Sequence, residues 1–327
     1  MISVKANKHP VYMWIRGAAL VLAALFILVS LAPYLLPFKQ LEGDRYEQAY
    51  TNSFFETIDE LELHFRLWSG EEAERGNIFL LHGLGASTFS WRHVAPYFEA
   101  KGYRVIAADL PGFGLSERKA GIDHSASARA EKMWELLNYI APQEQWHLVG
   151  HSMGGATVTA MTMLEPEKTA SLTMVAGAVR HFEPNFISFL LKYPPLSRWF
   201  KYMSSNVLVR EERVERFLQS AYGRRPEHNE VIGYYQPLTI RGTETTYLDM
   251  VDSAAAPLPG DLSELQLPVL LLWGEEDSWV PIEDGLRLEG KIEGSRLVRF
   301  ADQGHCPMET APELFNQALE SFLSGLH

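Results

Sequence analysis

The sequence predicts an α/β fold, in which a mostly parallel sheet is flanked by helices, with a helical insertion and an N-terminal membrane helix. Short apolar runs without alternation, which are typical of strands buried on both faces, recur through most of the chain. Helical stretches lie between these runs, and the alternation implies parallel strands joined by right-handed crossovers. The interval 180–256 lacks convincing strands and contains short amphipathic helical patches instead.

The first distinct element is an uncharged apolar segment near the N-terminus. It reads GAALVLAALFILVSLAPYLLPF from Gly17 to Phe38, and about 20 apolar residues suffice to cross a bilayer as a helix. Lys5, Lys8 and Arg16 precede it. They modestly favour a cytoplasmic N-terminus, with the rest of the chain on the periplasmic or other extracytoplasmic side. We therefore predict a single-pass membrane anchor within residues 1–39.

Two other interpretations of this segment remain open. Ser30 and Ala32 form a candidate cleavage site for a signal peptide, although Pro33 directly follows it and the apolar run is long for a signal peptide. The segment could also be a buried core helix, but an uncharged stretch of this length at the extreme N-terminus seldom serves as one.

The predicted sheet begins after a short charged connector at 40–52. SFFETI and LELHFRLW flank Asp59 and Glu60, and the alternation in the second of them predicts a β-hairpin. Helices are expected from Ser127, from Met153 and over Pro312–Leu323. Six apolar runs predict the buried strands: NIFLLHG, YRVIAAD, WHLVG, SLTMVAG, PVLLLWG and SRLVRF.

The helical insertion at 180–256 is predicted to form a cap over the carboxyl edge of the sheet. It carries ten Lys and Arg residues against nine Asp and Glu residues, whereas the whole chain has a formal net charge of −12. This near-neutral charge suits either a solvated surface or a face that approaches lipid. The cap separates two segments of one core, 40–179 and 257–327, and the anchor at 1–39 precedes them.

Composition excludes several classes of protein. A net charge of −12 argues against a nucleic-acid partner, because phosphate binding needs a basic face. Cys306 is the single cysteine, so no intramolecular disulfide can form. The sequence has no His, Cys or carboxylate cluster at metal-ligand spacing, so we predict neither a metal nor a cofactor.

The most informative chemical motif is GHSMG, residues 150–154, which matches G-x-S-x-G. It follows the apolar run WHLV and opens a helical stretch. In such a sharp strand-to-helix turn the serine hydroxyl stands above the sheet edge. Glycines are needed on either side because a side chain there would collide with neighbouring backbone. The pattern alone is weak, but its position predicts that Ser152 is a nucleophile.

A serine nucleophile needs a base and an acid that orients the base, in the chain order Ser, Asp or Glu, His. Asp277 lies just beyond the apolar run VLLLW, at the same predicted sheet edge as Ser152. Glu275 and Glu276 compete with it but lie closer to the strand end. His305 follows the last predicted strand and precedes the C-terminal helix. We predict Asp277 as the acid and His305 as the base.

Acyl transfer also needs N–H donors for the negative charge that develops on the carbonyl oxygen. The N–H of Met153, directly after the nucleophile, is one candidate. The loop HGLG supplies the second, for which we favour the N–H of Leu84, with Gly85 as the alternative. His82 is expected to shape this loop through hydrogen bonds.

With HGLG, DLPGFGLS, GHSMGG, WGEEDSWVP and GHCPMET in this order, the chain resembles the α/β-hydrolase superfamily from about Phe54 to the C-terminus. The GHSMGG elbow is similar to that of monoacylglycerol lipases and related bacterial esterases. The resemblance assigns the roles of nucleophile, acid and base to Ser152, Asp277 and His305. Serine at the elbow separates the chain from epoxide hydrolases and haloalkane dehalogenases of this fold, which have aspartate there.

The resemblance implies a membrane-anchored hydrolase of carboxylic esters. The anchor and the near-neutral cap favour lipid-like or medium-chain acyl esters, such as monoacylglycerols. Phe186, Phe189, Trp199 and Tyr235 of the cap are candidates for substrate binding, although they could equally form the cap's own core. A lactonase, an amidase or a cofactor-free peroxidase of the same fold, or a non-catalytic anchored binding protein, remain alternatives.

Overall fold

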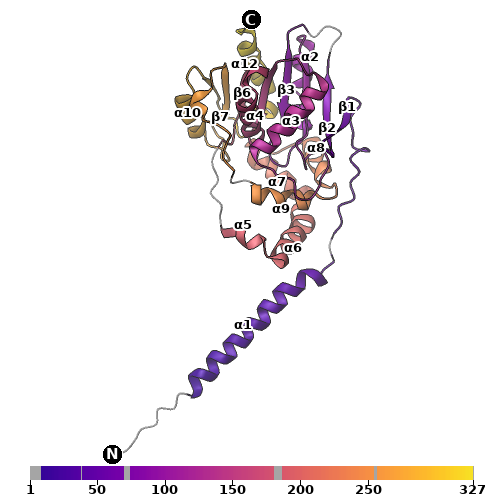
Figure 1. Ribbon diagram of the computed structural model, residues 1–327, viewed down its shortest axis with the longest axis vertical. Helices are drawn as coiled ribbons and strands as arrows, with labels where there is room; N and C mark the ends of the chain where they lie inside the picture. The colour runs from indigo at the N-terminus through magenta and orange to yellow at the C-terminus, as the bar shows by residue number, and fades with distance from the viewer. Residues whose placement is uncertain (1–8, 38, 70–73, 180–185, 254–255, 327) are drawn as a thin grey trace, which may run out of the picture.

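One eight-stranded sheet organises the molecule, in the order β1-β2-β4-β3-β5-β6-β7-β8. The computed structural model describes residues 9–37, 39–69, 74–179, 186–253 and 256–326. β1 is antiparallel to β2 and β2 to β4, whereas all other neighbours are parallel, which confirms the predicted α/β fold (Figure 1). The strands are β1 (Ser53–Ile58), β2 (Leu61–Trp68), β3 (Asn77–Leu81), β4 (Arg104–Ala108), β5 (Trp146–His151), β6 (Thr169–Val175), β7 (Val269–Gly274) and β8 (Arg296–Phe300).

The predicted hairpin is present between β1 and β2. Ile58 pairs with Leu61 across a turn in which Asp59 and Glu60 have φ values of 47° and 62°. This left-handed conformation at both turn residues matches the twist of the flanking strands. Farther into the sheet, β3 and β5 are buried along their whole length, which explains why their sequences are apolar without alternation.

Helices cover both faces of the sheet. α3, α4 and α10 contribute Met133, Val158 and Leu288 to one hydrophobic cluster, while α2 and α12 contribute Phe98 and Phe315 to another. Alternate residues of β3 belong to the two clusters, as expected for a strand buried on both faces. These helices are α2 (Ala95–Ala100), α3 (Ala126–Ile140), α4 (Met153–Leu164), α10 (Ile282–Lys291) and α12 (Pro312–Ser324), with the short α11 (Pro307–Thr310) before α12.

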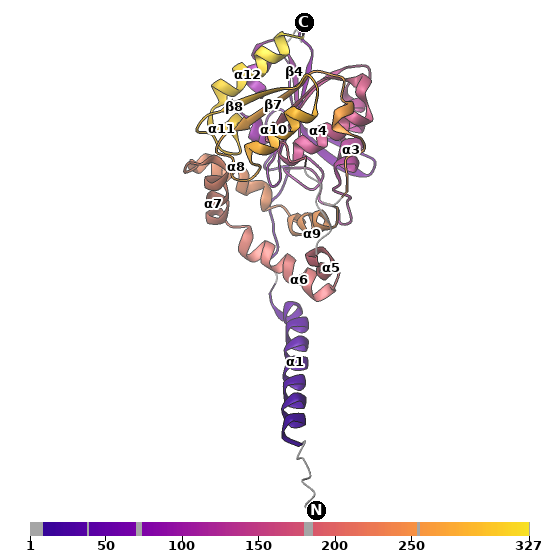
Figure 2. The same ribbon diagram turned by 90° about the vertical axis from the view of Figure 1, so that its left-hand side faces the viewer.

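A group of helices lies between β6 and β7, in the interval predicted to form the cap, and we call it the cap. Figure 2 shows it between the sheet and the N-terminal helix. Residues 180–185 and 254–255, which adjoin the two predicted boundaries, lie outside the described residues, so these boundaries stay predictions. The cap comprises α5 (Phe186–Leu191), α6 (Pro194–Met203), the π-helical turn η3 (Ser204–Leu208), α7 (Glu211–Tyr222), α8 (His228–Leu238) and α9 (Thr243–Ser253).

The N-terminal helix α1 (His9–Leu35) projects away from the core (Figure 1). It begins before the predicted Gly17 because Tyr12 to Ile15 continue the same helix, and Phe38 lies outside the described residues. Residues 12–35 have a mean hydropathy of 2.4 in their most apolar part, and only 6% of that part is buried. By length and composition this helix could cross a membrane. A signal sequence has the same properties.

The end of α1 nearest the core packs against cap helix α6. The Nε of Arg198 donates a hydrogen bond to the carbonyl of Pro33 at 2.7 Å, and the indole N–H of Trp199 donates one to the carbonyl of Val29 at 2.9 Å. The ring of Tyr193 stacks on Phe26, with 6.0 Å between the centroids. The cap therefore joins the core to the only described helix that is long and apolar enough to span a bilayer.

Candidate active site

Ser152 stands alone between β5 and α4 in a strained backbone conformation. Its φ and ψ are 51° and −116°, a region that non-glycine residues rarely occupy and that costs about 1–3 kcal/mol. Backbone hydrogen bonds on both sides hold it there. Its N–H donates to the carbonyl of Val175 at 2.9 Å, and its carbonyl accepts from the N–H groups of Gly155 at 2.9 Å and Ala178 at 3.0 Å. This is the sharp turn that the G-x-S-x-G spacing predicts.

The flanking glycines are required by close backbone approach. A Cβ on Gly150 would lie 2.3 Å from the carbonyl oxygen of Gly154. A Cβ on Gly154 would lie 2.5 Å from the carbonyl oxygens of both Leu81 and His82. Neither neighbour is a flexible side chain that could move aside. The glycines therefore let α4 start tight against β3 and β5, with Ser152 at the sheet edge.

His305 and Asp277 form a buried hydrogen-bonded pair. The Nδ1 of His305 lies 2.7 Å from Oδ2 of Asp277. The other carboxylate oxygen, Oδ1, accepts from the backbone N–H groups of Trp279 and Val280 at 2.8 and 2.9 Å. Because the acid is a carboxylate, Nδ1 carries the proton of this pair and leaves Nε2 as the free acceptor. Glu275 is the competing acid, and its Oε1 lies instead 3.7 Å from the Nε of Arg299.

Two contacts fix the backbone of His305. Its N–H donates to the carbonyl of Ala221, in cap helix α7, at 2.7 Å. Its carbonyl accepts from the Nε2 of His151 at 2.9 Å, and the two imidazole centroids are 4.6 Å apart. Burial lowers the pKa of His151 well below its usual value, so this ring is neutral. His305 is thus held beside the residue that directly precedes Ser152.

Hydrogen bonds of His82 hold the loop after β3, which is predicted to supply one oxyanion donor. The Nδ1 of His82 donates to the carbonyl of Gly83 at 2.7 Å, and its Nε2 accepts from the N–H of Leu110 at 3.0 Å. His82 is fully buried and shapes the loop, as the sequence predicts. Leu84 faces the same cavity as Ser152. Met153 opens α4, so its N–H has no intrahelical acceptor.

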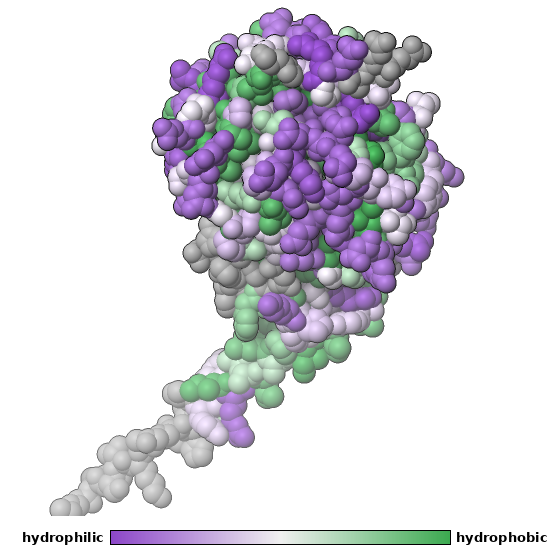
Figure 3. Space-filling view, turned by 45° about the horizontal axis from the view of Figure 1, so that its top comes forward, coloured by the Kyte–Doolittle hydropathy of each residue, from purple (hydrophilic) through white to green (hydrophobic). Residues whose placement is uncertain are grey.

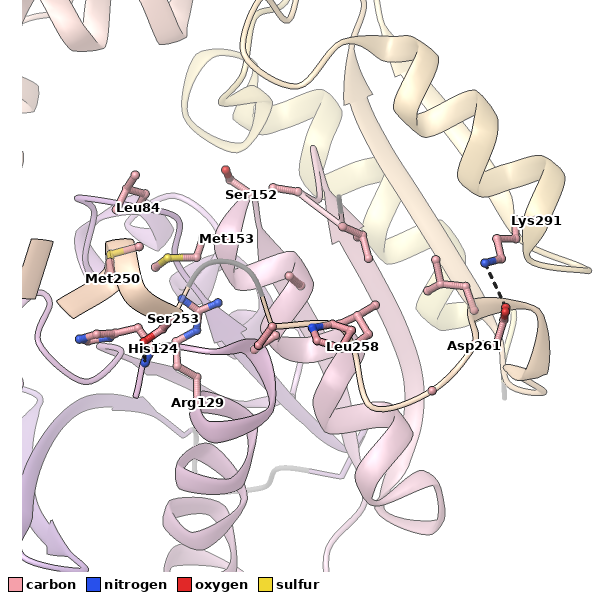
Figure 4. Close-up of a pocket in the computed structure, with 18 residues that line it drawn as sticks. Leu84, His124, Arg129, Ser152, Met153, Met250, Ser253, Leu258, Asp261 and Lys291 are labelled. Atoms are coloured by element: carbon pink, nitrogen blue, oxygen red, sulfur yellow. Dashed lines mark hydrogen bonds and ion pairs between the residues drawn. The ribbon is translucent and has the colours of Figure 1, made fainter. Parts of the chain in front are cut away.

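A cavity of about 660 Å³ lies beside Ser152 (Figure 4). Its walls are largely aliphatic, although several polar side chains interrupt them. The lining comprises Leu84, His124, Ala126, Arg129, Ser152, Met153, Ala156, Ala178, Val179, Met250, Ser253, Ala256, Pro257, Leu258, Gly260, Asp261, Leu262 and Lys291. The space can hold a medium-sized organic ligand.

The cap aromatics predicted to bind substrate lie elsewhere. Trp199 donates a hydrogen bond to α1, and Phe189 is largely exposed. Tyr235 packs against the hydrophobic cluster that contains Phe98 and Phe315. The side chain of Phe186 lies outside the described residues. The described lining of the cavity includes none of the other three, so their predicted role gains no support. Aromatic composition alone did not indicate which cap surface faces Ser152.

Sequence reasoning missed two buried polar residues of the cavity, His124 and Arg129. Arg129 lies in α3, four residues before Met133 and eight before Leu137, in the apolar stripe of that helix. An arginine in a buried stripe is unusual, and that spacing was the available signal. His124 lies in the loop before α3 and gives no comparable pattern.

Glu309 connects the loop of His305 to the cap. Its carboxylate accepts from the hydroxyls of Tyr234 at 2.5 Å and Tyr222 at 2.8 Å, and it also contacts the guanidinium of Arg92. Tyr222 and Tyr234 belong to α7 and α8. Cys306, next to His305, is buried in the same hydrophobic cluster as Tyr222 and Tyr234. Burial raises the pKa of its thiol well above the usual value.

Comparison with known proteins places these features in a family. The family described as alpha/beta hydrolase fold matches residues 76–312. An uncharacterized hydrolase, YugF, of Bacillus subtilis (strain 168) is 28% identical over 271 residues, which cover 82% of this chain and 96% of that protein. A 2-hydroxy-6-oxononadienedioate/2-hydroxy-6-oxononatrienedioate hydrolase of Klebsiella pneumoniae is 28% identical over 263 residues, covering 76% of this chain and 86% of the relative.

Among solved structures, the crystal structure of a membrane phospholipase A, described as a bacterial virulence factor, is similar to this chain. The two are 21% identical with a TM-score of 0.69, and the match covers 96% of this chain and 99% of the other. At this identity the likeness concerns the fold.

Proposed function

The chain belongs to the alpha/beta hydrolase fold family, and on this premise we propose that it is a membrane-anchored serine hydrolase of carboxylic esters. One observation carries the proposal: the strained Ser152 directly follows His151, the ring of His151 contacts His305, and His305 is hydrogen-bonded to Asp277. A family match alone does not assign a reaction, because the same fold hosts many activities.

In the proposed mechanism Nε2 of His305 takes the proton of Ser152 as the hydroxyl attacks the ester carbonyl. Asp277 holds the ring of His305 in the required tautomer and stabilises the imidazolium that forms. The N–H groups of Met153 and Leu84 donate to the oxyanion. His305 then protonates the leaving alcohol, and water releases the acyl group by the reverse route.

Lipid-like or medium-chain acyl esters, such as monoacylglycerols, are the proposed substrates. The largely aliphatic cavity beside Ser152 supports an acyl chain as the occupant. The contacts between α6 and the end of α1 would hold the cap near the bilayer surface. Figure 3 shows hydrophobic side chains over α1 and the adjoining end of the cap, whereas the upper part of this face is mostly hydrophilic.

A fluorophosphonate probe tests the proposal directly. We expect the full-length protein to be labelled covalently, and Ser152→Ala to abolish labelling because the probe reacts only with an activated serine. Ser197→Ala, a change in cap helix α6, is the matched control and should keep full labelling. Folded wild-type protein that does not react, or labelling that persists in Ser152→Ala, would rule out this nucleophile.

Carbonate extraction of membranes tests the anchor. We expect full-length protein to stay in the membrane pellet at alkaline pH, because α1 would place a largely apolar span of 24 residues in the bilayer. Protease added to intact cells with a permeabilised outer layer should degrade the hydrolase domain, since we propose that it lies on the extracytoplasmic side. Release of uncleaved protein into the supernatant would refute a spanning helix, and an N-terminus that starts after Ala32 would identify a signal peptide instead.

A further inference from the structure

The cavity beside Ser152 contains a buried cation for which the described residues provide no counterion. Arg129 is only 5% exposed, yet in the described part of the chain its guanidinium forms no hydrogen bond or ion pair, and its Nε is buried without an acceptor. His124 is 3% exposed, and neither of its ring nitrogens has a partner within the same described residues. In Figure 4 the side chain of Arg129 rises from α3 toward Met153, and Ser152 lies beyond it.

Among the described residues, the nearby carboxylates form no ion pair with Arg129. Asp261, across the cavity, is paired with Lys291 at 3.1 Å. Asp123 is close enough to influence the pKa of Arg129 but forms no described ion pair with it; its carboxylate accepts from the N–H of Ser125 at 2.8 Å. Burial lowers the pKa of Arg129 only to about 10, so the side chain is a full cation near pH 7.

His124 complements this cation as a neutral group. Burial, followed by the charge of Arg129, lowers the pKa of His124 to about 4, so near pH 7 its ring offers one N–H donor and one acceptor nitrogen. Arg129 offers several N–H donors in a planar fork, which fits two oxygens of one anionic group. Together the two residues provide donors but no negative charge.

A buried, unpaired charge destabilises the empty protein, since desolvation is not offset by a partner. Such a residue is expected where a ligand supplies the missing charge. We propose that Arg129, with His124, binds a singly charged oxyanion on the substrate that Ser152 cleaves, either a carboxylate or a phosphodiester. This inference rests on the proposed function and narrows its substrates to amphiphilic esters with an anionic end group.

Three matched esters test the proposal by kinetics. One is the mono-4-nitrophenyl ester of suberic acid, the second is its neutral methyl ester, and the third carries a methyl phosphodiester in place of the carboxylate. We expect wild-type kcat/KM to be about 10- to 100-fold higher for at least one anionic ester than for the neutral one, the usual range for a charged hydrogen bond. The better anionic ester identifies the source of the oxyanion.

Arg129→Met should bring this anionic-to-neutral ratio close to one, and Arg129→Lys should leave an intermediate ratio, because it keeps the charge but loses the fork. Lys132→Met is the matched control: it removes a cation from the same helix that pairs outside the cavity with Asp59 and Glu135. It should keep the wild-type ratio. A wild-type ratio of one or below, or an unchanged ratio in Arg129→Met, would overturn the proposal.

A second experiment does not depend on turnover. In the full-length Ser152→Ala background, calorimetry should show that monomethyl suberate binds about tenfold more tightly than dimethyl suberate, and that Arg129→Met removes the difference. If no ester is hydrolysed, this measurement still decides whether the anion site exists. The melting temperature of ligand-free Arg129→Met should equal or exceed that of the wild type. A clear fall would assign Arg129 a structural role and refute the proposal.

Discussion

Asp277→Asn is expected to lower kcat by about 10⁴-fold while the protein remains folded. The reason lies in the two ends of the carboxylate. Oδ1 receives two backbone N–H groups, from Trp279 and Val280, so the single oxygen of an asparagine must occupy that position. Its NH₂ group then faces Nδ1 of His305, which must become an acceptor. The proton of the ring moves to Nε2, and His305 can no longer take a proton from Ser152.

The measurement is kcat on a 4-nitrophenyl ester that the wild type hydrolyses, together with the far-ultraviolet circular dichroism of both proteins. Glu275→Gln is the control, because it neutralises an acid two residues away whose nearest described cation is Arg299 at 3.7 Å. It should retain activity within about twofold, as for a weak surface ion pair. If Asp277→Asn keeps more than a tenth of the wild-type kcat, another residue orients the base.

The features that the sequence predicted well are those encoded locally. The strand runs are apolar without alternation because both faces of β3 and β5 are covered, and this pattern is visible in a few residues. The elbow is equally local, since the two glycines of G-x-S-x-G are required by backbone atoms that lie within a few ångströms of them. The expected chain order of serine, acid and histidine was then enough to propose Asp277 as the acid and His305 as the base.

The features that the sequence could not indicate depend on distant segments meeting. Trp199 bonds to Val29, 170 positions away, and no periodicity distinguishes a cap aromatic that packs on α1 from one that lines a pocket. Arg129 and His124 become conspicuous only when their surroundings are known to contain no counterion among the described residues. In the sequence, the available signal was the place of Arg129 in the apolar stripe of α3, and that stripe does not show whether a counterion lies nearby.

Asp109 provides the largest expected effect on stability. This residue opens the loop DLPGFGLS, and its carboxylate is fully buried. Oδ1 accepts from the N–H of Thr88 at 2.6 Å. Oδ2 accepts from the N–H of Leu115 at 2.7 Å and lies 2.6 Å from Nδ1 of His64. A Cβ on Gly114 would lie about 2 Å from this carboxylate, so the surrounding loop closes directly on it.

Asp109→Asn is therefore expected to destabilise the protein by about 3–5 kcal/mol, because one end of the amide must place an N–H against another N–H in a buried site. The corresponding fall in melting temperature is about 10 °C. Thermal unfolding of the full-length protein in detergent measures it. Asp302→Asn is the control: Asp302 is exposed at φ 56°, a conformation that asparagine also adopts, and the melting temperature should hardly change.

The pH dependence of this difference separates lost hydrogen bonds from a general packing defect. Burial raises the pKa of Asp109, but the neighbouring His64 and the N–H of Leu115 outweigh it, so the pKa lies below the usual value of 3.8. A carboxylate with a lowered pKa contributes its stability above the unfolded-state pKa and loses it as the pH falls through the folded-state pKa. The wild type should therefore keep its advantage over Asp109→Asn from about pH 5 to 8 and lose it only below about pH 4. An advantage that persists undiminished in acid would contradict this explanation, because the carboxylate charge would then not be what stabilises the loop.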